Sequence, residues 1–364
     1  MMQSKSIVFV LAALPSGGAE RVASTLINHC HQLGWKITLI IGHGKERDFY
    51  QLPEDIDRII IPAGSPSGSK IVALCKNIPY LVKLRRALKS VESSTVLSFL
   101  TRTNIHTLLA SLGLKKRVII SERNDTTREE HPWPWPLLRK WFYNSADMVT
   151  ANSEIAVEGM RDYVQNKKLV IVPNPVLLPA DQAKPSRSKL LLNVGRLVPQ
   201  KAQHLLIEAF SIIRSRGIEG WGLQILGEGE EREHLENLII DYGLQDEVQL
   251  CGVVENIGVK YENAGIFVLP SLYEGTPNAL LEAMAYGLPC VVSDSQLGSL
   301  KLVNHPENGL VFASGDAKDL AEKLGYLMKD EGLRERAGVN ARKTVEPYSI
   351  EEIHKVWEKI FRFE

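Results

Sequence analysis

The sequence has no long apolar run. Its longest candidates, such as Leu190–Leu192 and Ile266–Leu269, are far shorter than the roughly 20 residues that cross a bilayer. We therefore expect no transmembrane helix. Hydrophobic residues make up 44% of the chain and charged residues 24%, which is typical of a soluble globular protein and argues against disorder.

Cysteine is scarce, and the four that occur lie far apart. They form no C-x-x-C pair, and the nine histidines form no H-x3-H pair backed by cysteine or carboxylate. These absences argue against a zinc site and against a disulfide framework. The pattern instead predicts small buried hydrophobes in a reducing cytoplasm. The four are Cys30, Cys75, Cys251 and Cys290.

Net charge is also absent, since 43 Lys+Arg balance 43 Asp+Glu. The balance conceals an asymmetry, because residues 1–175 carry 23 basic and 15 acidic side chains while the remainder carries 20 and 28. A basic first half can face nucleic acid, an anionic membrane or a pyrophosphate-bearing substrate. The alternative is an ordinary basic surface that is exposed to solvent and binds none of these partners.

Length and periodicity predict two α/β domains. A chain of 364 residues suits two domains of roughly 150 to 200 residues. Short apolar strands alternate with amphipathic segments, which is typical of parallel sheets wound by right-handed crossovers. The expected strands are Ile7–Leu11, Lys36–Ile41, Arg58–Ile61, Val96–Phe99, Val118–Ser121, Met148–Ala151, Lys189–Val194, Gly222–Leu226, Val248–Leu250, Ile266–Leu269 and Pro289–Ser293.

The domain boundary is expected in the proline-rich stretch VPNPVLLPADQAKPSRS, residues 172–188, because prolines and polar residues suit a hinge. We assign residues 1–175 to the first domain and residues 176–345 to the second. The stretch SIEEIHKVWEKIFRF, within residues 346–364, predicts a final amphipathic helix with no strand after it.

The stretch SIVFVLAALPSGGAER, residues 6–21, admits two interpretations. It is either an export signal or the first strand and glycine turn of a nucleotide-binding domain. KLLLNVGRLVPQKAQHLLIEAFSII repeats the same plan later in the chain, and an export signal explains only the first copy. We therefore predict that Gly17 and Gly18 let the backbone approach a phosphate at a helix N-terminus. In the second copy, Arg196 and Lys201 can supply charge to the same anion.

Two carboxylates follow in PSLYEGTPNALLEAMAYGLPCVVSD, residues 270–294. Glu274 lies in the loop after a strand and Glu282 inside the next helix, so both can line a crevice at the carboxyl edge of the sheet. Carboxylates suit the hydroxyls of a sugar nucleotide, while Arg196 and Lys201 suit its pyrophosphate. For the spacing alone, a pair of solvated helix glutamates is the alternative.

Together these stretches resemble glycosyltransferase family 4, the retaining glycosyltransferases of GT-B fold, over nearly the whole chain. The order of the motifs, with E-x7-E behind GR-x4-K, is more specific than any one of them. The motifs are SGGAER (Ser16–Arg21), VPNPV (Val172–Val176), GRLVPQK (Gly195–Lys201), LGEGEER (Leu226–Arg232), EGTPNALLEAMAYGLP (Glu274–Pro289) and ENGLVF (Glu307–Phe312).

The resemblance implies two facing Rossmann-like domains, with the acceptor bound by residues 1–175, the donor by residues 176–345, and residues 346–364 packing back on the first domain. Arg196 and Lys201 would bind the donor diphosphate. Glu282 would hold the ribose and Glu274 the transferred sugar. Gly17 and Gly18 would approach the diphosphate from the first domain. The remaining donor contacts would come from the helix start, at Thr276, Asn278, Ala279 and Leu280.

One loop departs from the wider family, in which many members carry a histidine near the reacting sugar. This chain has SERND, residues 121–125, so Arg123 takes the histidine position, with Glu122 and Asn124 beside it. A fixed positive charge excludes proton transfer but permits contact with phosphate or sugar. We favour this catalytic role for Arg123, because similar S-E-R-N loops occur in the bacterial polysaccharide and lipid-linked oligosaccharide transferases that the chain resembles. An arginine that pairs with Glu122 or Asp125 to shape the loop is the alternative.

A metal site is the competing reading of Asp55-Ile56-Asp57, a D-x-D pattern. Metal-dependent transferases of the other major fold hold a nucleotide with such a pattern. Here it follows Pro53 and directly precedes an expected strand, so we predict no essential metal. The family resemblance implies a nucleotide-sugar substrate and no other cofactor, with UDP favoured over GDP or ADP.

The acceptor side is inferred from two stretches that combine aromatic residues with cations. HPWPWPLLRKWFYNSAD, residues 131–147, includes Trp133, Trp141, Arg139 and Lys140, and YLVKLRRALK spans residues 80–89. This combination suits an anionic membrane interface, although domain core plus a basic face is the alternative. We expect a peripheral protein on the inner face of the cytoplasmic membrane, with a polyprenyl-diphosphate-linked saccharide acceptor and no nucleic-acid partner.

Two other classes of protein are weighed. A Rossmann dehydrogenase needs G-x-G-x-x-G after the first strand, and PSGGAER fails that spacing. A non-catalytic sugar-nucleotide binder or scaffold of the same fold would lack one of the four charged residues that bind the donor. All four are present, namely Arg196, Lys201, Glu274 and Glu282. The resemblance thus implies a hexosyltransferase that moves a hexose or N-acetylhexosamine with retention of configuration.

Overall fold

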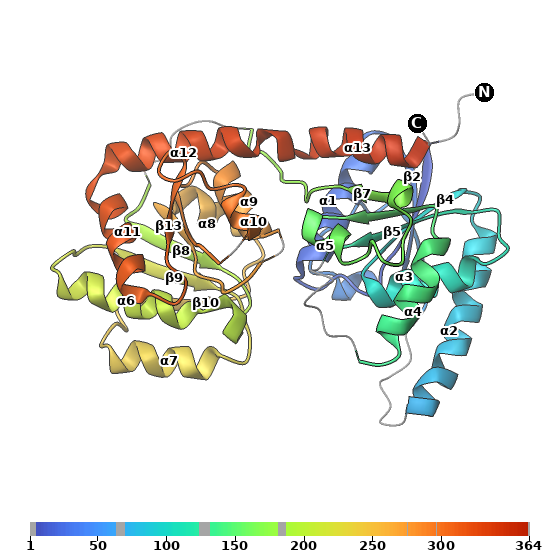
Figure 1. Cartoon of the computed structure of the whole chain (residues 1–364), viewed down its shortest axis with the longest axis horizontal. Helices are drawn as coiled ribbons and strands as arrows, with labels where there is room; N and C mark the ends of the chain where they lie inside the picture. Colours follow the sequence, from blue (N-terminus) through green and yellow to red (C-terminus); the bar gives the residue numbers. More distant parts are fainter. Residues whose placement is uncertain are drawn as a thin grey trace. The chain divides into compact units, whose positions relative to one another are not determined.

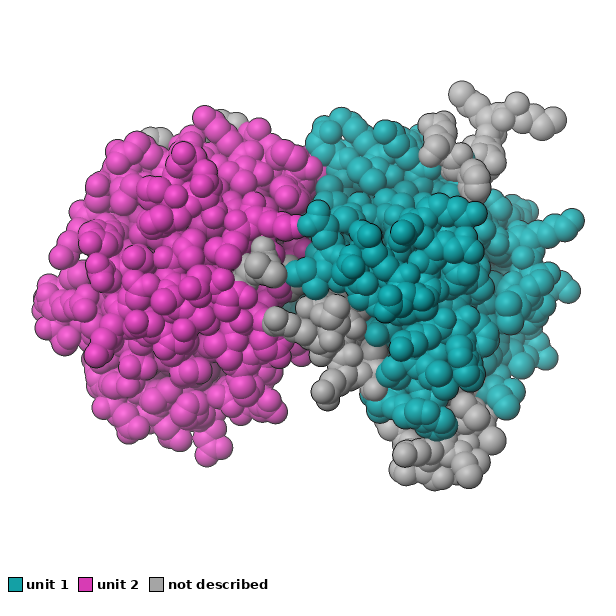
Figure 2. Space-filling view, viewed as in Figure 1, with its two compact units in different colours: residues 1–175, 350–364 teal, residues 176–349 magenta. Residues whose placement is uncertain are grey.

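The computed structural model describes residues 5–62, 70–123, 132–180, 187–274, 276–295 and 297–362. The chain divides into two compact units, which Figure 2 colours separately. Unit 1 consists of residues 1–175 and 350–364, and unit 2 consists of residues 176–349. Each is a parallel sheet between layers of helices (Figure 1), which confirms the predicted α/β class.

Unit 1 is built on a sheet that has, in its described residues, seven parallel strands in the order β3-β2-β1-β4-β5-β6-β7. Its strands are β1 (Ser6–Val10), β2 (Lys36–Ile41), β3 (Asp57–Ile60), β4 (Thr95–Phe99), β5 (Arg117–Glu122), β6 (Met148–Ala151) and β7 (Leu169–Ile171). Its helices are α1 (Gly18–Gln32), α2 (Lys70–Ser90), α3 (Thr101–Ser111), α4 (Trp135–Phe142), α5 (Glu154–Glu158) and α13 (Ile350–Arg362), with short 3-10 turns η1 (Lys45–Arg47), η2 (Tyr143–Ser145) and η3 (Asn166–Lys168).

Side chains of each strand in unit 1 alternate between two apolar layers, as the pleat requires. Ile7 and Phe9 of β1 join a cluster with residues of α1 and α13. Val8 and Val10 point the other way and join a cluster that includes Leu84 of α2. Both faces of the sheet are therefore covered by helices, which is why the central strand β1 is apolar on both sides.

Helix α13 contributes its apolar face to the core of unit 1. Ile353 and Trp357 are among its buried side chains, and the Trp357 ring stacks on Phe361 with centroids 5.5 Å apart. The Phe361 carbonyl, in the last turn, accepts a hydrogen bond of 3.1 Å from Arg117 of β5. A cation at this end also complements the helix dipole, so α13 is fixed by packing and by its C-terminal contact.

Unit 2 repeats the plan with six parallel strands, among its described residues, in the order β10-β9-β8-β11-β12-β13. Its strands are β8 (Leu190–Val194), β9 (Gly222–Leu226), β10 (Val248–Gly252), β11 (Ile266–Leu269), β12 (Cys290–Ser293) and β13 (Gly309–Phe312). Its helices are α6 (Gln203–Ser215), α7 (Arg232–Asp241), α8 (Ile257–Asn263), α9 (Asn278–Ala285), α10 (Leu297–Leu300), α11 (Ala317–Lys329) and α12 (Glu331–Val345), with 3-10 turns η4 (Pro199–Lys201) and η5 (Glu346–Tyr348).

The faces of the second sheet follow the same alternation. Leu191 packs in a cluster with residues of α6 and α11, and Leu192 packs in the opposite cluster with residues of α9 and α12. Among the described residues, no helix is both long enough and apolar enough to cross a bilayer. Residues 181–186 of the expected hinge lie outside the described part of the chain.

Candidate active site

The carboxyl edge of the second sheet brings together two of the predicted residues. Lys201 ends η4 in the loop after β8, and Glu274 lies in the loop after β11. The Lys201 ammonium donates to Oε1 of Glu274, and the two side chains are only 16% and 10% exposed. A shielded ion pair at this edge provides both a cation for phosphate and a carboxylate for sugar hydroxyls.

The loop after β8 is held against the loop after β9 by backbone contacts. The Leu197 amide donates to the Glu228 carbonyl at 3.0 Å, and the Glu231 amide donates to the Leu197 carbonyl at 3.0 Å. A Cβ on Gly227 or on Gly229 would lie 2.0 or 2.1 Å from a carbonyl oxygen of the β8 loop. The glycines of LGEGEER thus permit this close approach, which no larger residue allows.

The β8 loop is also joined to the loop that carries Glu274. The Leu272 amide donates to the Gln200 carbonyl at 2.8 Å, and the Gln200 side-chain amide donates to the Tyr273 carbonyl at 2.8 Å. These two bonds involve the residues that directly precede Lys201 and Glu274 in their loops. They fix the distance between the two loops, so the pairing depends on local backbone geometry as well as on charge.

Glu282 is the fifth of the eight residues of α9 and is 8% exposed. Its Oε2 accepts a hydrogen bond of 3.0 Å from the Tyr261 hydroxyl, and the Tyr261 ring, from α8, stacks on Tyr286 with centroids 5.5 Å apart. The carboxylate is therefore oriented by a buried phenol. No sequence pattern pointed to Tyr261, because its position opposite Glu282 arises from the packing of α8 on α9.

The other predicted donor residues differ in their exposure. The Arg196 side chain is exposed, and its carbonyl accepts from Gln203 at 3.0 Å. At the start of α9, Thr276, Asn278 and Ala279 are half-buried, whereas the Leu280 side chain is fully buried. The Leu280 amide donates to the Pro277 carbonyl at 3.1 Å, so it is already used within the first turn.

In unit 1, the glycine pair lies where α1 begins. Gly17 is the N-cap residue and Gly18 the first helical residue. A Cβ on Gly17 would lie 2.2 Å from Oε2 of Glu20, so the Glu20 carboxylate folds back over the helix N-terminus. Burial raises the pKa of Glu20, while a backbone hydrogen bond lowers it. An acidic side chain thus occupies the end of α1 that favours anions.

Arg123 lies at the carboxyl end of β5 and is 6% exposed. Its guanidinium donates to Ser121 Oγ at 2.8 Å, to the Val172 carbonyl at 2.9 Å and to Asn174 Oδ1 at 3.0 Å. Burial lowers the pKa of Arg123. Its described hydrogen bonds all stay inside unit 1, which fits the loop-shaping alternative, with Val172 and Asn174 as partners. The charge of Glu122 also acts on Arg123, and Asp125 lies outside the described residues.

Glu122 is fully buried beside Arg123. Its Oε1 accepts from Thr101 at 2.9 Å and from the Tyr143 hydroxyl. The carboxylate therefore joins β5, α3 and η2 within unit 1. Asn124, the third residue expected in this loop, lies outside the described residues.

The aromatic and basic stretches need one correction. Trp133 and Trp141 are 67% and 65% exposed, as a surface role requires, but Arg139 is buried at 8%. Because α4 is short and packs on the rest of unit 1, Arg139 falls on its inner side while Lys140 stays exposed. Among the described side chains of α2, the exposed cations are Lys83, Arg85, Arg86 and Lys89.

The D-x-D pattern lies at the amino end of β3 rather than at the carboxyl edge of the sheet. Asp55 accepts from His31 at 3.0 Å, a contact that lowers the pKa of Asp55, and Asp57 is the first residue of β3. Across the described ranges, no three His, Cys, Asp or Glu side chains are grouped so that they could hold a metal ion.

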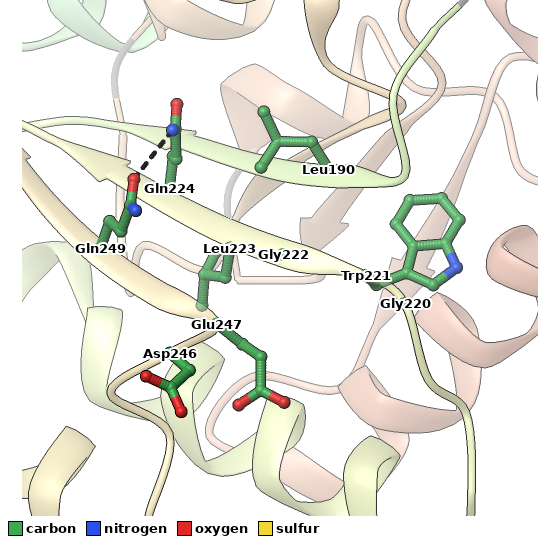
Figure 3. A pocket seen from close by; sticks show the side chains of 9 residues that line it. All are labelled: Leu190, Gly220, Trp221, Gly222, Leu223, Gln224, Asp246, Glu247 and Gln249. Atoms are coloured by element: carbon green, nitrogen blue, oxygen red, sulfur yellow. Dashed lines mark hydrogen bonds between the residues drawn. The ribbon is translucent and has the colours of Figure 1, made fainter.

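A pocket of about 360 Å³ lies at the opposite edge of the second sheet from the Lys201–Glu274 pair. Figure 3 shows its lining around the amino ends of β8, β9 and β10. Trp221 and Glu247 form part of it, and Glu247 is paired with Arg214 at 2.8 Å. Ligands of parallel α/β sheets bind at the carboxyl ends of the strands, so this pocket is separate from the candidate site.

Solved structures share this fold over nearly the whole chain. HepE of Anabaena, in complex with UDP-glucose, superposes with a TM-score of 0.82 at 17% identity and covers 98% of this chain and 99% of its own. The lipopolysaccharide outer core galactosyltransferase WaaB gives a TM-score of 0.71 at 21% identity, with 99% and 100% covered. The two units therefore have the GT-B fold.

Curated relatives match over similar lengths. One is the GalNAc-alpha-(1->4)-GalNAc-alpha-(1->3)-diNAcBac-PP-undecaprenol alpha-1,4-N-acetyl-D-galactosaminyltransferase of Campylobacter jejuni, 28% identical over 358 residues and 97% of each chain. Another is N-acetylgalactosamine-N,N'-diacetylbacillosaminyl-diphospho-undecaprenol 4-alpha-N-acetylgalactosaminyltransferase of the same organism, 29% identical with 91% and 92% covered. The amylovoran biosynthesis glycosyltransferase AmsD of Erwinia amylovora is 24% identical, with 98% and 99% covered.

Two family profiles together span most of the sequence. The profile described as Glycosyltransferase Family 4 matches residues 16–178, and that described as Glycosyl transferases group 1 matches residues 177–344. The fold, the carboxyl-edge site and these profiles define a glycosyltransferase. The chain belongs to glycosyltransferase family 4, as its motifs predict.

Proposed function

We propose that the protein transfers a hexose or N-acetylhexosamine from a UDP-sugar, with retention of configuration, to a polyprenyl-diphosphate-linked saccharide in the assembly of a bacterial surface polysaccharide. The observation that carries the proposal is the shielded Lys201–Glu274 pair at the carboxyl edge of unit 2. Supporting it, two relatives are named as α-N-acetylgalactosaminyltransferases on undecaprenyl-diphosphate-linked acceptors, and HepE is seen with UDP-glucose.

We propose that three groups of residues bind different parts of the donor. Arg196 and Lys201 bind the diphosphate, as cations next to a growing negative charge. Glu274 accepts from hydroxyls of the transferred sugar, and Glu282, oriented by Tyr261, accepts from the ribose hydroxyls. Gly17 and Gly18 let the backbone of unit 1 contact the diphosphate.

In the proposed reaction, an acceptor hydroxyl oxygen forms a bond to the anomeric carbon on the face from which the diphosphate leaves. The bond between that carbon and the diphosphate oxygen breaks, and its electron pair stays on the diphosphate. The leaving diphosphate oxygen takes the hydroxyl proton, so no protein base and no metal ion is needed. Lys201 stabilises the negative charge as the bond breaks, in the manner of a preorganised electrostatic contact.

The proposed location is the inner face of the cytoplasmic membrane, where the lipid-linked acceptor is presented. Exposed Trp133 and Trp141 can lie at the depth of the lipid headgroups, and the exposed cations of α2 together with Lys140 can attract anionic lipids. This surface would hold the enzyme peripherally, and no nucleic acid is involved.

The donor class is tested by thermal unfolding with a panel of UDP-, GDP- and ADP-sugars. At 100 times its dissociation constant, the true donor adds about 2.7 kcal/mol to the free energy of unfolding. Turnover is then measured with a synthetic polyprenyl-diphosphate saccharide, with and without a metal chelator, and the product anomer is assigned by NMR. Binding of a nucleotide sugar without turnover on any lipid-linked acceptor would favour the non-catalytic binder, and an inverted product would reject the mechanism.

A further inference from the structure

The glycine turn of unit 1 is held by a neighbouring loop. We call residues 11–17, between β1 and α1, the glycine loop, and residues 42–56, between β2 and β3, the β2 loop. Two backbone bonds join them: the Gly42 amide donates to the Ala12 carbonyl at 3.2 Å, and the Phe49 amide donates to the Leu14 carbonyl at 2.9 Å.

Two side chains of the β2 loop complete the contact. Nε2 of His43 accepts from the Leu14 amide at 3.3 Å, and the Tyr50 hydroxyl donates to the Gly17 carbonyl at 3.1 Å. Leu14 thus has both of its backbone groups bonded to the β2 loop, and its side chain is fully buried. The conformation of the glycine loop therefore depends on the β2 loop rather than on glycine flexibility alone.

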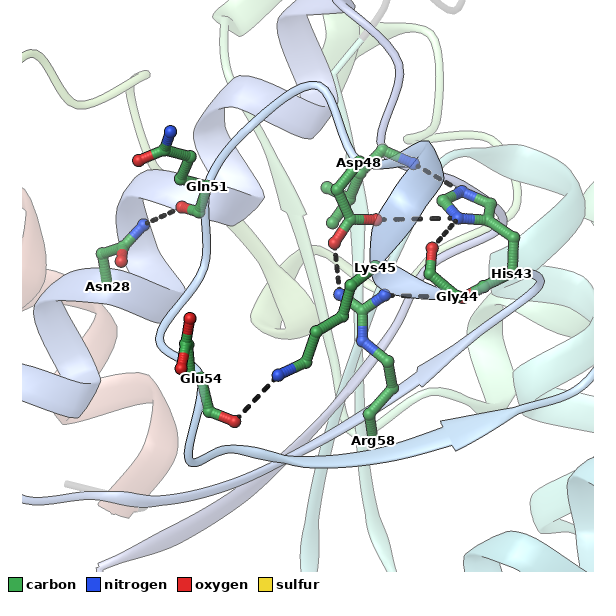
Figure 4. Close-up of polar contacts among 9 residues, drawn as sticks. Asn28, His43, Gly44, Lys45, Asp48, Gln51, Glu54 and Arg58 are labelled. Carbon is green, nitrogen blue, oxygen red and sulfur yellow. Dashed lines mark hydrogen bonds and ion pairs between the residues drawn. The ribbon is translucent and has the colours of Figure 1, made fainter.

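The contact with Leu14 fixes the tautomer of His43. Because Nε2 accepts from an amide, the ring proton lies on Nδ1, which donates to the Gly44 carbonyl at 2.9 Å. Figure 4 shows the groups that orient the ring. Asp48 Oδ1 lies 3.6 Å from Nδ1, and the other Asp48 oxygen accepts from Arg58.

These orienting groups are themselves shielded from water. The side chains of His43, Asp48 and Arg58 are 12%, 9% and 8% exposed, respectively. Arg58 also donates to the His43 carbonyl at 3.5 Å. A buried backbone amide needs only one hydrogen-bond acceptor. Here the acceptor is a histidine that is itself oriented by a buried ion pair, which is more than the packing of the loop requires.

We propose that His43 is a positioning residue for donor binding. By accepting from the Leu14 amide it holds the glycine loop in the conformation that presents the backbone of Gly17 and Gly18 to the donor diphosphate. The inference rests on the proposed function, because it assigns the glycine loop to a UDP-sugar. His43 belongs to no motif of the family resemblance and touches no reacting group.

The test compares three variants of the full chain. His43→Leu removes the acceptor at similar size, and His43→Gln restores one through its side-chain oxygen. Asn28→Ala is the matched control, because Asn28 bonds the Gln51 carbonyl of the same β2 loop at 3.0 Å but not the glycine loop (Figure 4). Each is measured for UDP affinity, for KM and kcat with the UDP-sugar, and for hydrogen exchange of the Leu14 amide.

We expect His43→Leu to accelerate Leu14 exchange and to raise the donor KM about tenfold, the scale of one lost hydrogen bond, with kcat changed less than threefold. His43→Gln should recover most of both effects, and Asn28→Ala should show neither. Tyr50→Phe keeps the ring and loses the bond to Gly17, so it should raise the donor KM severalfold. This variant tests the inference if His43→Leu does not fold.

Equal Leu14 exchange in His43→Leu and unsubstituted protein would overturn the inference, as would a donor KM equal to that of Asn28→Ala. Failure of the proposed function looks different. In that case the unsubstituted protein would bind no UDP and no UDP-sugar, and the assignment of the loop to a donor would fall with it.

Discussion

The guanidinium of Arg123 donates to the carbonyl of Val172, 49 positions further along the chain, at 2.9 Å. The same group lies over the Trp357 ring of α13, 5.4 Å from its centroid, and over the Phe99 ring at 5.8 Å. One side chain thus links β5, the VPNP segment and α13. Such a contact joins three parts of unit 1 that are remote in sequence.

Arg123→Lys is expected to destabilise unit 1 by roughly 2 kcal/mol, because a lysine ammonium cannot reach the same acceptors in plane and loses the stacking. Urea unfolding followed by Trp fluorescence measures the change. Arg117→Lys, which alters the contact with Phe361, is the control and should cost less. If Arg123→Lys unfolds like the parent but loses turnover, Arg123 contacts phosphate or sugar and the loop-shaping role is wrong.

Glu282→Ala and Lys201→Ala are expected to affect different steps. Glu282 holds ribose in ground state and transition state alike, so its loss should weaken donor binding by roughly 1.5 to 3 kcal/mol. Lys201 faces charge that grows as the bond breaks, so its loss should lower kcat at saturating donor by about 10² to 10³. Full kinetics of both variants, with circular dichroism, provide the comparison.

Controls for this pair come from their partners. Tyr261→Phe keeps the ring and removes the bond to Glu282, so it should reproduce a fraction of the Glu282→Ala loss in donor binding. Removing Lys201 also leaves Glu274 unpaired, and urea unfolding of Lys201→Ala separates that cost from catalysis. A rise in donor KM with kcat intact in Lys201→Ala would contradict the leaving-group role.

Acid should weaken the packing of α13 through His354. Its pKa is lowered to about 4, chiefly by burial and also by the positive charges of His29, Lys5 and Arg362, against the opposing charge of Glu358. The unfolded chain takes up this proton near pH 6.5, so it binds more protons than the folded state between those values. The free energy of unfolding should therefore fall by roughly 2 kcal/mol from pH 6.5 to pH 4.

His354→Gln should flatten this part of the stability curve, measured by urea unfolding at closely spaced pH values. His234→Gln, at an exposed position of α7, serves as the control and should leave the slope unchanged. Parallel curves for the parent and His354→Gln would assign the acid sensitivity to other groups.

Membrane attachment is tested with the cations that the structure leaves exposed. Replacing Lys83, Arg86, Lys89 and Lys140 by Ser should weaken binding to anionic vesicles at low salt at least a hundredfold, since each such charge contributes about 1 kcal/mol. Turnover of a short water-soluble acceptor should persist. Sedimentation of vesicles is the measurement.

A second quadruple variant with the same change of charge is the control. It replaces exposed cations of unit 2, namely Lys318, Lys329, Arg336 and Lys343, and should bind vesicles as the parent does. Equal loss in both variants would mean that net charge, rather than this face of unit 1, attracts the protein to the vesicles.

Most of the fold was predictable from sequence because parallel strands are short apolar runs between helices. Lys36–Ile41 and Ile266–Leu269 form strands with the predicted bounds. Two strands were not predicted. β7 has only three residues at a sheet edge, and β13 lies inside ENGLVF, which was noted as a motif only. β7 is only partly covered, so its apolar pattern is weak, whereas β13 is largely buried but has only four residues.

The candidate site was predictable as a set of residues but not as a set of contacts. The E-x7-E spacing placed Glu274 and Glu282 at one sheet edge, yet each has a different partner: Lys201 for the first and Tyr261 for the second. The contacts that Tyr261 and His43 make depend on where tertiary packing places these two residues. Neither residue lies in a spacing pattern that local sequence could reveal.

The membership of α13 in unit 1 has a consequence for the order of synthesis. Residues 1–175 leave the ribosome first, but the layer against α1 lacks Ile353 and Trp357 until residues 350–362 have been made. Unit 2 holds all of its own residues in one continuous stretch and can complete its core earlier. Until residues 350–362 have been synthesised, the nascent first unit therefore exposes an apolar face, which is the kind of surface that chaperones bind.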